Sequence, residues 1–168
     1  TYYGINEQDM RFSTNDNISD FVSYIGSLSV PFAFMNNKIR GSLNLSGRYN
    51  KFYNFKDGID QSYLYGRKAW HSNGNLYVGY EITSRFGFYL NPYYETKTRR
   101  LQTVSKGCSS MNLGMQYKLL KDKSLVLSLT ADDIFNQERE SSKIFYGDKS
   151  VANYVWASTQ NVMLTLSY

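Results

Sequence analysis

The chain has 168 residues, of which 42% are hydrophobic and 17% aromatic, including 16 Tyr and 10 Phe. Its mean hydropathy is -0.49, and no segment approaches the ~18 consecutive apolar residues of a membrane-spanning helix, which excludes a helical membrane protein. The net charge is +5, but the 19 Lys and Arg residues are scattered along the chain, so we expect no nucleic-acid partner.

Residues that hold cofactors are sparse in this chain. Its single cysteine, Cys108, excludes an intramolecular disulfide and offers no metal-ligand spacing. There is no glycine-rich phosphate-binding loop and no activated nucleophile, so we expect neither a cofactor nor a metal. Thr1 to Gly4 lack the basic and apolar regions of a signal peptide, as in a mature protein or an internal fragment.

The first long pattern follows a short segment, Tyr2 to Phe12, which is interpreted as the end of an earlier strand. From Asp20 to Phe34 the apolar residues fall on even positions and the serines on odd positions, which predicts a long strand with one apolar and one polar face. The apolar positions are Val22, Tyr24, Leu28, Val30, Phe32 and Phe34, and the polar ones are Ser23, Ser27 and Ser29.

A second strand is predicted after a tight turn at Asn36-Asn37, because Asn tolerates positive φ. This strand, Lys38 to Asn54, alternates apolar residues with polar ones that include Arg40 and Arg48. Arginines are unfavourable in a dry core, so we expect the polar face to be in contact with water. Phe55 to Lys68 then lacks alternation and is predicted to be a long loop.

The middle of the chain repeats this arrangement. Strands are predicted from Ala69 to Thr83 and from Phe86 to about Thr96, joined by a short turn at Ser84-Arg85. Trp70, Leu76, Val78, Tyr80, Ile82, Phe88, Leu90 and Tyr94 are expected on the apolar face, and His71, Asn73, Asn75 and Glu81 on the polar face. Thr98 to Gly107 is polar and basic and is predicted to be a loop.

The last third of the chain contains the clearest alternation. Met111 to Leu119 and Leu125 to Phe135 are predicted strands on either side of a short turn at Lys121 to Lys123. Asn136 to Ser158 is predicted to be irregular, and a final strand from Val162 to Tyr168 closes the chain.

These seven strands are longer than the usual 5 or 6 residues of soluble domains and approach the ~9 to 11 residues of a strand that crosses a bilayer. Short and long connections alternate along the chain, which is typical of a transmembrane β-barrel. The predicted fold is therefore an all-β, antiparallel up-and-down transmembrane barrel with about 7 or 8 strands in this chain. Pro31 and Pro92 interrupt the patterns, and we expect bulges or strand ends there.

Residues 107 to 136 read GCSSMNLGMQYKLLKDKSLVLSLTADDIFN, and the chain ends in LTLSY. The strand LGMQYKLLKDK within this segment and the DIFN element at Asp133 to Asn136 resemble the late strands of the TonB-dependent receptor-like outer membrane β-barrel family common in Bacteroidetes. The similarity extends upstream to Ser27 to Pro31 and to Leu43 to Gly47, and so covers nearly the whole chain. The terminal Tyr168 departs from the family, in which many members continue for a few residues to a terminal Phe.

The resemblance implies a barrel of about 22 strands with a plug domain in its lumen. Residues 1 to 168 would be a single C-terminal barrel segment without the plug. They would form barrel wall and extracellular loops for nutrient uptake, in contact with outer-membrane lipid, the plug and a nutrient ligand. TonB-type energy coupling would act through other parts of the protein. The alternative is a complete eight-stranded outer-membrane barrel, with the N-terminal segment as its eighth strand, that has a structural or adhesion role.

Several polar residues have both a structural and a functional interpretation. His71 beside Ser72 suggests a barrel enzyme, but adjacent strand residues point to opposite faces, so we expect a hydrogen-bonded histidine and no enzyme activity. Asp132-Asp133 is interpreted as an anchor that accepts hydrogen bonds from loop amides. Candidate ligand contacts are Lys97, Arg99 and Arg100, for lipid A phosphates or an acidic ligand, and Tyr154 and Trp156, for stacking.

Overall fold

The computed structural model describes residues 2–15, 17–57, 64, 66–138, 141–146, 148–154 and 158–168. Within these ranges the chain forms β-strands, and none of the described segments is a helix long and apolar enough to cross a membrane. The all-β prediction is confirmed.

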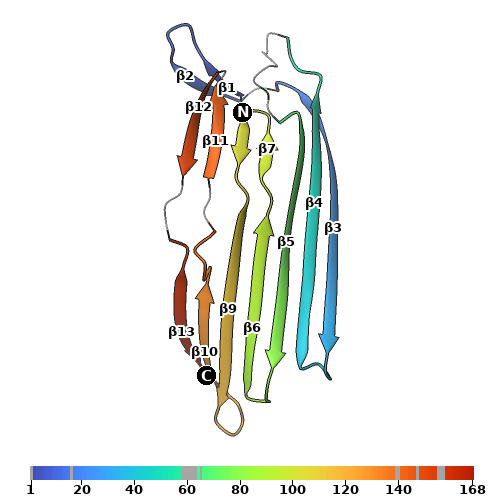
Figure 1. Ribbon diagram of the computed structural model, residues 1–168, viewed down its shortest axis with the longest axis vertical. Helices are drawn as coiled ribbons and strands as arrows, with labels where there is room; N and C mark the ends of the chain where they lie inside the picture. Colours follow the sequence, from blue (N-terminus) through green and yellow to red (C-terminus); the bar gives the residue numbers. More distant parts are fainter. Residues whose placement is uncertain are drawn as a thin grey trace.

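Seven strands form one antiparallel sheet in which sequence neighbours lie side by side (Figure 1). They are β3 (Asp20–Phe34), β4 (Ile39–Tyr53), β5 (Lys68–Glu81), β6 (Phe86–Glu95), β9 (Cys108–Leu119), β10 (Leu125–Asp132) and β13 (Asn161–Ser167). Their order is β13-β10-β9-β6-β5-β4-β3, so β3 and β13 are the edges and the sheet is open. The seven predicted strands are confirmed, whereas a closed barrel is not formed by these residues alone.

The short turns lie together at one end of the sheet (Figure 1). Asn36 and Asn37 have φ angles of 53° and 65°, as the sequence predicts for this turn. In the turn after β9, the Asp122 carboxylate accepts hydrogen bonds from the amide and hydroxyl of Ser124, at 3.2 and 2.9 Å. These bonds lower the pKa of Asp122.

The strand register brings the predicted apolar positions into common rows. Phe34 pairs with Ile39, Ile39 with Tyr80, Tyr80 with Phe88, and Phe88 with Met115. The opposite face is polar and cross-linked by side chains: Ser29 Oγ donates to Asn44 Oδ1 at 2.6 Å, and Ser46 Oγ donates to Asn73 Oδ1 at 2.8 Å. The sheet thus has one apolar and one hydrogen-bonded polar face.

The apolar face is exposed, and a conventional core is nearly absent. Among the described residues, the buried hydrophobic side chains are Ile18, Leu64 and Ala69. By contrast, Leu28 is 56% exposed, Trp70 62% and Leu164 68%. A contiguous apolar surface of this kind requires apolar surroundings, since soluble monomers rarely expose one.

Aromatic side chains bound the apolar face at both ends. Tyr24, Tyr49 and Trp70 form one cross-strand row, and Phe34 and Tyr80 belong to the row at the turn end. Ten residues separate Tyr24 from Phe34, which is about 34 Å along a strand. At a tilt of about 45° this corresponds to about 24 Å across the sheet, which matches the ~25 Å apolar band of outer-membrane barrels.

The long connections contain strands that the sequence patterns did not predict. The loop prediction for Thr98 to Gly107 is wrong, because β7 (Thr98–Arg100) and β8 (Thr103–Ser105) form a hairpin. The irregular prediction for Asn136 to Ser158 is also wrong in part, because it contains β11 (Ser141–Tyr146) and β12 (Lys149–Tyr154). These four strands form a second sheet in the order β12-β11-β8-β7. They were missed because each strand has only three to six residues, and because the pairing of β8 with β11, which joins the two hairpins, is distant in sequence.

The N-terminal segment is not the end of an earlier strand of the main sheet. Residues Tyr2–Ile5 (β1) and Arg11–Thr14 (β2) pair with each other as a separate hairpin. It contacts the second sheet through an edge-on contact between the Tyr3 and Tyr146 rings. The eighth strand of the alternative small barrel is therefore not part of the seven-stranded sheet.

The two prolines behave differently. Pro31 lies within an unbroken β3–β4 ladder, so the predicted bulge is absent; β3 is an edge strand, where a missing N–H is tolerated. At Pro92 the ladder between β5 and β6 is interrupted between the pairs Asn75–Tyr93 and Val78–Leu90. The register is the same on both sides of this gap and β6 continues through Pro92, so ladder pairs are lost there but the predicted bulge or strand end is absent.

Candidate functional site

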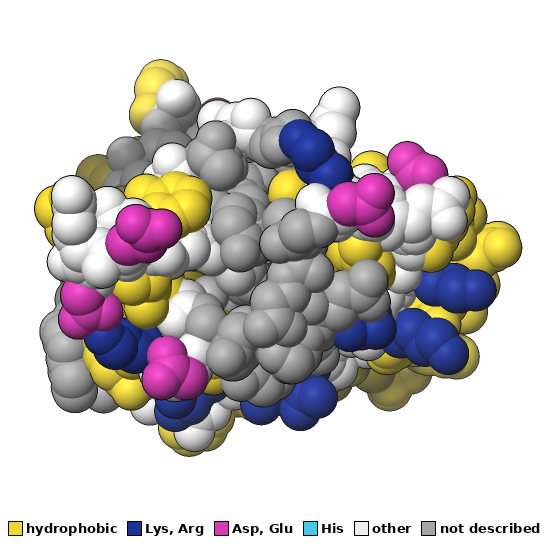
Figure 2. Space-filling view, turned by 90° about the horizontal axis from the view of Figure 1, so that it is seen from above, with side chains coloured by type: hydrophobic (Ala, Val, Ile, Leu, Met, Phe, Trp, Pro, Cys, Tyr) yellow, Lys and Arg dark blue, Asp and Glu magenta, His cyan; other side chains and the backbone are white. Residues whose placement is uncertain are grey.

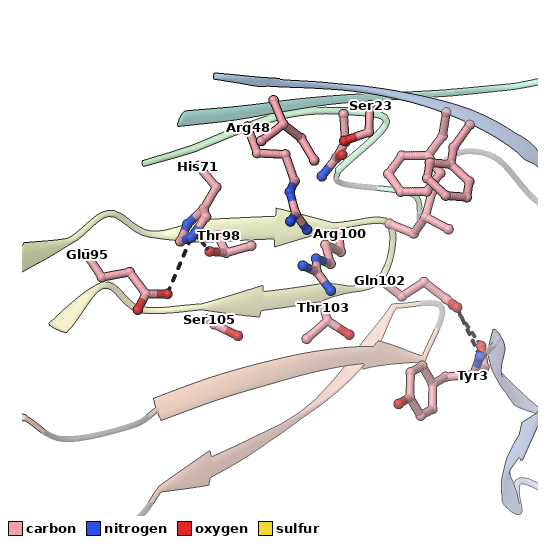
Figure 3. A pocket seen from close by; sticks show the side chains of 15 residues that line it. Tyr3, Ser23, Arg48, His71, Glu95, Thr98, Arg100, Gln102, Thr103 and Ser105 are labelled. Atoms are coloured by element: carbon pink, nitrogen blue, oxygen red, sulfur yellow. Dashed lines mark hydrogen bonds and ion pairs between the residues drawn. The ribbon is translucent and has the colours of Figure 1, made fainter. Parts of the chain in front are cut away.

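A cavity of about 860 Å³ lies on the polar face at the end of the long connections (Figure 3). Side chains of β3, β4 and β5 form one wall, and the β7–β8 hairpin forms the opposite wall. Lining residues include Ser23, Arg48, Asn50, His71, Glu95, Thr98, Arg100 and Gln102.

The β7–β8 hairpin is fixed beside β5 by backbone and side-chain contacts. Ser72 N donates to Thr96 Oγ1 at 2.8 Å, and Thr96 N donates to Ser72 O at 2.9 Å. Further along, Gly66 and Leu101 form an antiparallel bridge. A Cβ at Gly66 would lie 2.7 Å from the Leu101 nitrogen, so only glycine allows this approach.

Gln102 at the tip of this hairpin connects three segments. Its side chain is buried and holds the Tyr3 backbone on both sides: it accepts from Tyr3 N at 3.0 Å and donates to Tyr3 O at 2.7 Å. Its own carbonyl accepts a hydrogen bond from Phe145 N at 2.9 Å. The cavity wall is therefore tied to β1 and β11. No pattern in the sequence distinguishes this glutamine, because its partners lie far away along the chain.

His71 projects into the cavity and has polar neighbours on both ring nitrogens (Figure 3). Its Nδ1 lies 2.8 Å from Thr98 Oγ1, and its Nε2 lies 3.6 Å from Glu95 Oε1. The other carboxylate oxygen of Glu95 accepts a hydrogen bond from the Tyr93 hydroxyl at 2.6 Å. This arrangement is the hydrogen-bonded histidine that the sequence predicts, and it links β5, β6 and β7.

Two arginines bring positive charge into the cavity from opposite walls. Arg48 extends from β4 and Arg100 from β7, and Figure 3 shows their guanidinium groups pointing into the same space. Among the described residues, neither guanidinium forms an ion pair with a carboxylate. Two like charges in one concave surface raise the local concentration of anions, so the cavity favours a ligand with a carboxylate, phosphate or similar group.

The structure separates the predicted ligand contacts. Arg100 lines the cavity. Side chains alternate along a strand, so the neighbouring Arg99 lies on the opposite side of β7, away from the cavity. Lys97 lines a different hollow of about 350 Å³, next to the ends of β6 and β9. Tyr154 ends β12 and is 54% exposed, and Trp156 lies outside the described residues. The roles of these residues remain predictions.

Asp133 is a buried structural anchor, as interpreted from the sequence. Its side chain is fully buried, and its carboxylate accepts the amides of Gln137 and Glu138, each at 3.0 Å, and the Thr159 hydroxyl. Its own amide donates to Asn112 Oδ1 at 2.9 Å. The carboxylate thus joins the end of β10 to the segments on both sides of the long connection, and the backbone amide of the same residue joins it to β9.

The described residues contain no group of three or more His, Cys, Asp or Glu side chains that could hold a metal ion. Cys108 is half-buried at the first position of β9, as a small apolar residue near a strand end.

Comparison with known proteins identifies the family. The sequence model of the outer membrane protein beta-barrel family matches residues 1–168. Neither the curated proteins nor the solved structures include a significant match. Membership of this family agrees with three features of the structure: the long antiparallel strands, the exposed apolar band between two aromatic rows, and the polar opposite face. The chain belongs to the outer membrane protein beta-barrel family, and its location is the outer membrane.

Proposed function

We propose that this chain is the C-terminal wall segment of a larger outer-membrane transporter of the TonB-dependent receptor type, as found in Bacteroidetes. In this proposal its polar face lines the lumen around a plug domain, and its long connections help to capture a nutrient. Energy coupling acts through the plug and TonB. The segment itself catalyses no reaction.

The open sheet carries this proposal. β3 and β13 lie at opposite edges, and each pairs with only one neighbouring strand. In a bilayer every backbone N–H and C=O needs a partner, so both edges require further strands. Single-chain bacterial barrels also contain an even number of strands, and seven is odd. Strands from other parts of a longer barrel would satisfy both requirements.

The cavity supports a role in ligand capture. It lies at the end of the long connections, which face the outside in outer-membrane barrels, and it opens on the polar face that would line the lumen. The facing arginines Arg48 and Arg100 favour an acidic nutrient.

Uptake in whole cells tests this function. A strain that lacks the protein is supplied with acidic nutrients too large for porins, beside a strain that lacks TonB. We expect both strains to lose uptake of the same nutrient, and the native gene to restore it in the first strain. Unchanged uptake of every nutrient in the first strain, or a loss that the TonB-deficient strain does not share, would contradict the proposal.

A further inference from the structure

Two lysines oppose each other directly on the apolar side of the sheet. The register pairs Lys51 of β4 with Lys68 of β5. Arg48 and Asn50 line the cavity on the polar face, so Lys51 projects from the opposite face by strand alternation. Lys68 likewise lies opposite to His71 and shares the face of Trp70. Both lysines are exposed.

This pair is not neutralised within the described part of the protein. Like charges directly opposite on neighbouring strands are destabilising. Neither lysine forms an ion pair with a described carboxylate. Asp20 lies nearby on β3, where Asn54 Nδ2 donates to its carboxylate at 3.0 Å, but no ion pair joins Asp20 to either lysine. The two ammonium groups are therefore available to an anion from outside the sheet.

A third cation lies at the same level. The antiparallel bridge between Gly66 and Leu101 brings the end of β7 beside the start of β5, and Arg99 and Lys68 each lie two residues from that bridge. Arg100 points into the cavity, so Arg99 lies on the other side of β7. Viewed from the loop end, Lys and Arg side chains lie along the rim of the molecule (Figure 2).

The depth of the lysines matches the headgroup region of a membrane. Lys51 and Lys68 lie two residues beyond Tyr49 and Trp70, the aromatic row that bounds the apolar band. Two residues correspond to about 7 Å along a strand and about 5 Å along the membrane normal at a tilt of about 45°. Aromatic belts mark the interface, so the lysines reach the level of lipid phosphates.

An apolar groove lies directly below the lysines. Its volume is about 570 Å³, and its lining includes Tyr24, Leu28, Leu45 and Trp70. The floor is a row of small residues, since Gly26 pairs with Gly47, and Gly47 with Ser72. A Cβ at Gly26 would meet no atom within 4 Å, so space remains above the floor on β3, whereas on β4 the Trp70 ring lies 3.0 Å from a Cβ position at Gly47 and bounds the groove there. The groove has the polarity and position for an acyl chain.

We propose that Lys51 and Lys68 bind the phosphate of an outer-leaflet glycolipid such as lipid A, with Arg99 beside them and an acyl chain in the groove below. The long connections lie at the extracellular end in barrels of this kind, so the lipid is one of the outer leaflet. Charge-assisted hydrogen bonds from two ammonium groups to one phosphate also relieve their mutual repulsion. The site lies outside the lumen and does not depend on the transport proposal.

Lipid competition in nanodiscs tests the site. The complete native protein is placed in phosphatidylcholine nanodiscs with a small fraction of bisphosphorylated lipid A, and the retained lipid is measured by native mass spectrometry. Each lysine is expected to contribute about fivefold to binding, so K51Q/K68Q should lower lipid A retention about 25-fold. K51R/K68R keeps both charges and should retain the lipid. K121Q/K123Q makes the same charge change in the turn at the other end and should have no effect.

Retention within twofold of the native level in K51Q/K68Q would overturn the proposal, as would an equal loss in K121Q/K123Q. Lipid A without its phosphates should bind like phosphatidylcholine, and equal binding of the phosphorylated and dephosphorylated forms would also contradict it. Inorganic phosphate at millimolar concentration should compete only weakly, because it lacks the acyl chain; full displacement would assign the site to a free anion instead. The gel shift between unheated and heated samples verifies that each variant is folded.

Discussion

Replacement of one residue on each side of the same strand tests the assignment of the two faces. Leu28 and Ser27 are neighbours on β3, and both are exposed. Leu28 lies on the apolar face, four residues from Tyr24 and six from Phe34. It is therefore about 10 Å below the upper aromatic row, close to the middle of the ~24 Å band. Ser27 lies at nearly the same depth on the polar face.

Leu28→Arg should destabilise the folded protein by about 2 to 4 kcal/mol, the effect of a cation near the bilayer midplane on the lipid face of a barrel. Ser27→Arg should change the free energy of unfolding by less than about 0.5 kcal/mol, because the polar face is in contact with water. The assay is reversible guanidinium unfolding of the complete protein in lipid vesicles. Equal destabilisation by both variants, or a larger effect of Ser27→Arg, would refute the assignment of the faces.

Three further predictions follow from individual contacts. Asp133→Ala removes the buried carboxylate that accepts hydrogen bonds from the Gln137 and Glu138 amides and the Thr159 hydroxyl, and should destabilise the fold by at least about 2 kcal/mol, against about 1 kcal/mol for Thr159→Ala, as measured by denaturant unfolding. Equal stability of Asp133→Ala and the native protein would contradict the anchoring role of Asp133. The hydrogen bond and charge of Lys149 lower the pKa of Asp9, so their contribution to docking of the β1–β2 hairpin is complete above the unfolded-state value of about 3.9 and is lost as pH falls through the lowered folded pKa. Protection factors of the β1 and β2 amides, which correct for the intrinsic slowing of exchange in acid, should therefore fall at acid pH in the native protein but much less in Lys149→Gln. A pH profile of protection that this substitution leaves unchanged would disprove the link. Finally, in a Cys108→Ser background, a cysteine at Ser105 in the cavity wall should react faster with an anionic than with a cationic thiosulfonate, and Arg48→Gln with Arg100→Gln should lower that preference at least about threefold; an unchanged preference would show that these arginines do not set the potential of the cavity.

The long strands could be predicted from sequence because their alternation is local. Asp20 to Phe34 was predicted with the bounds that the structure shows, because the polarity of each residue indicates which face of the strand it occupies. The turn at Asn36-Asn37 and the anchoring role of Asp133 were also evident, because Asn and Asp have distinct local backbone chemistry.

The cavity required information that local patterns do not contain. Thr98–Arg100 and Thr103–Ser105 are too short to show alternation, and β8 pairs with β11, far along the chain. The convergence of Arg48 with Arg100 depends on that hairpin, as does the role of Gln102. The pair Lys51–Lys68 depends on a register across a long connection, which the sequence does not set.

The mass of the intact native polypeptide, isolated from outer membranes, tests the central proposal most directly. The open edges at β3 and β13 predict a polypeptide several times heavier than the 19.5 kDa of this chain, with the additional strands needed to close the barrel. A native mass near 19.5 kDa would contradict the proposal that this sheet is one part of a larger transporter.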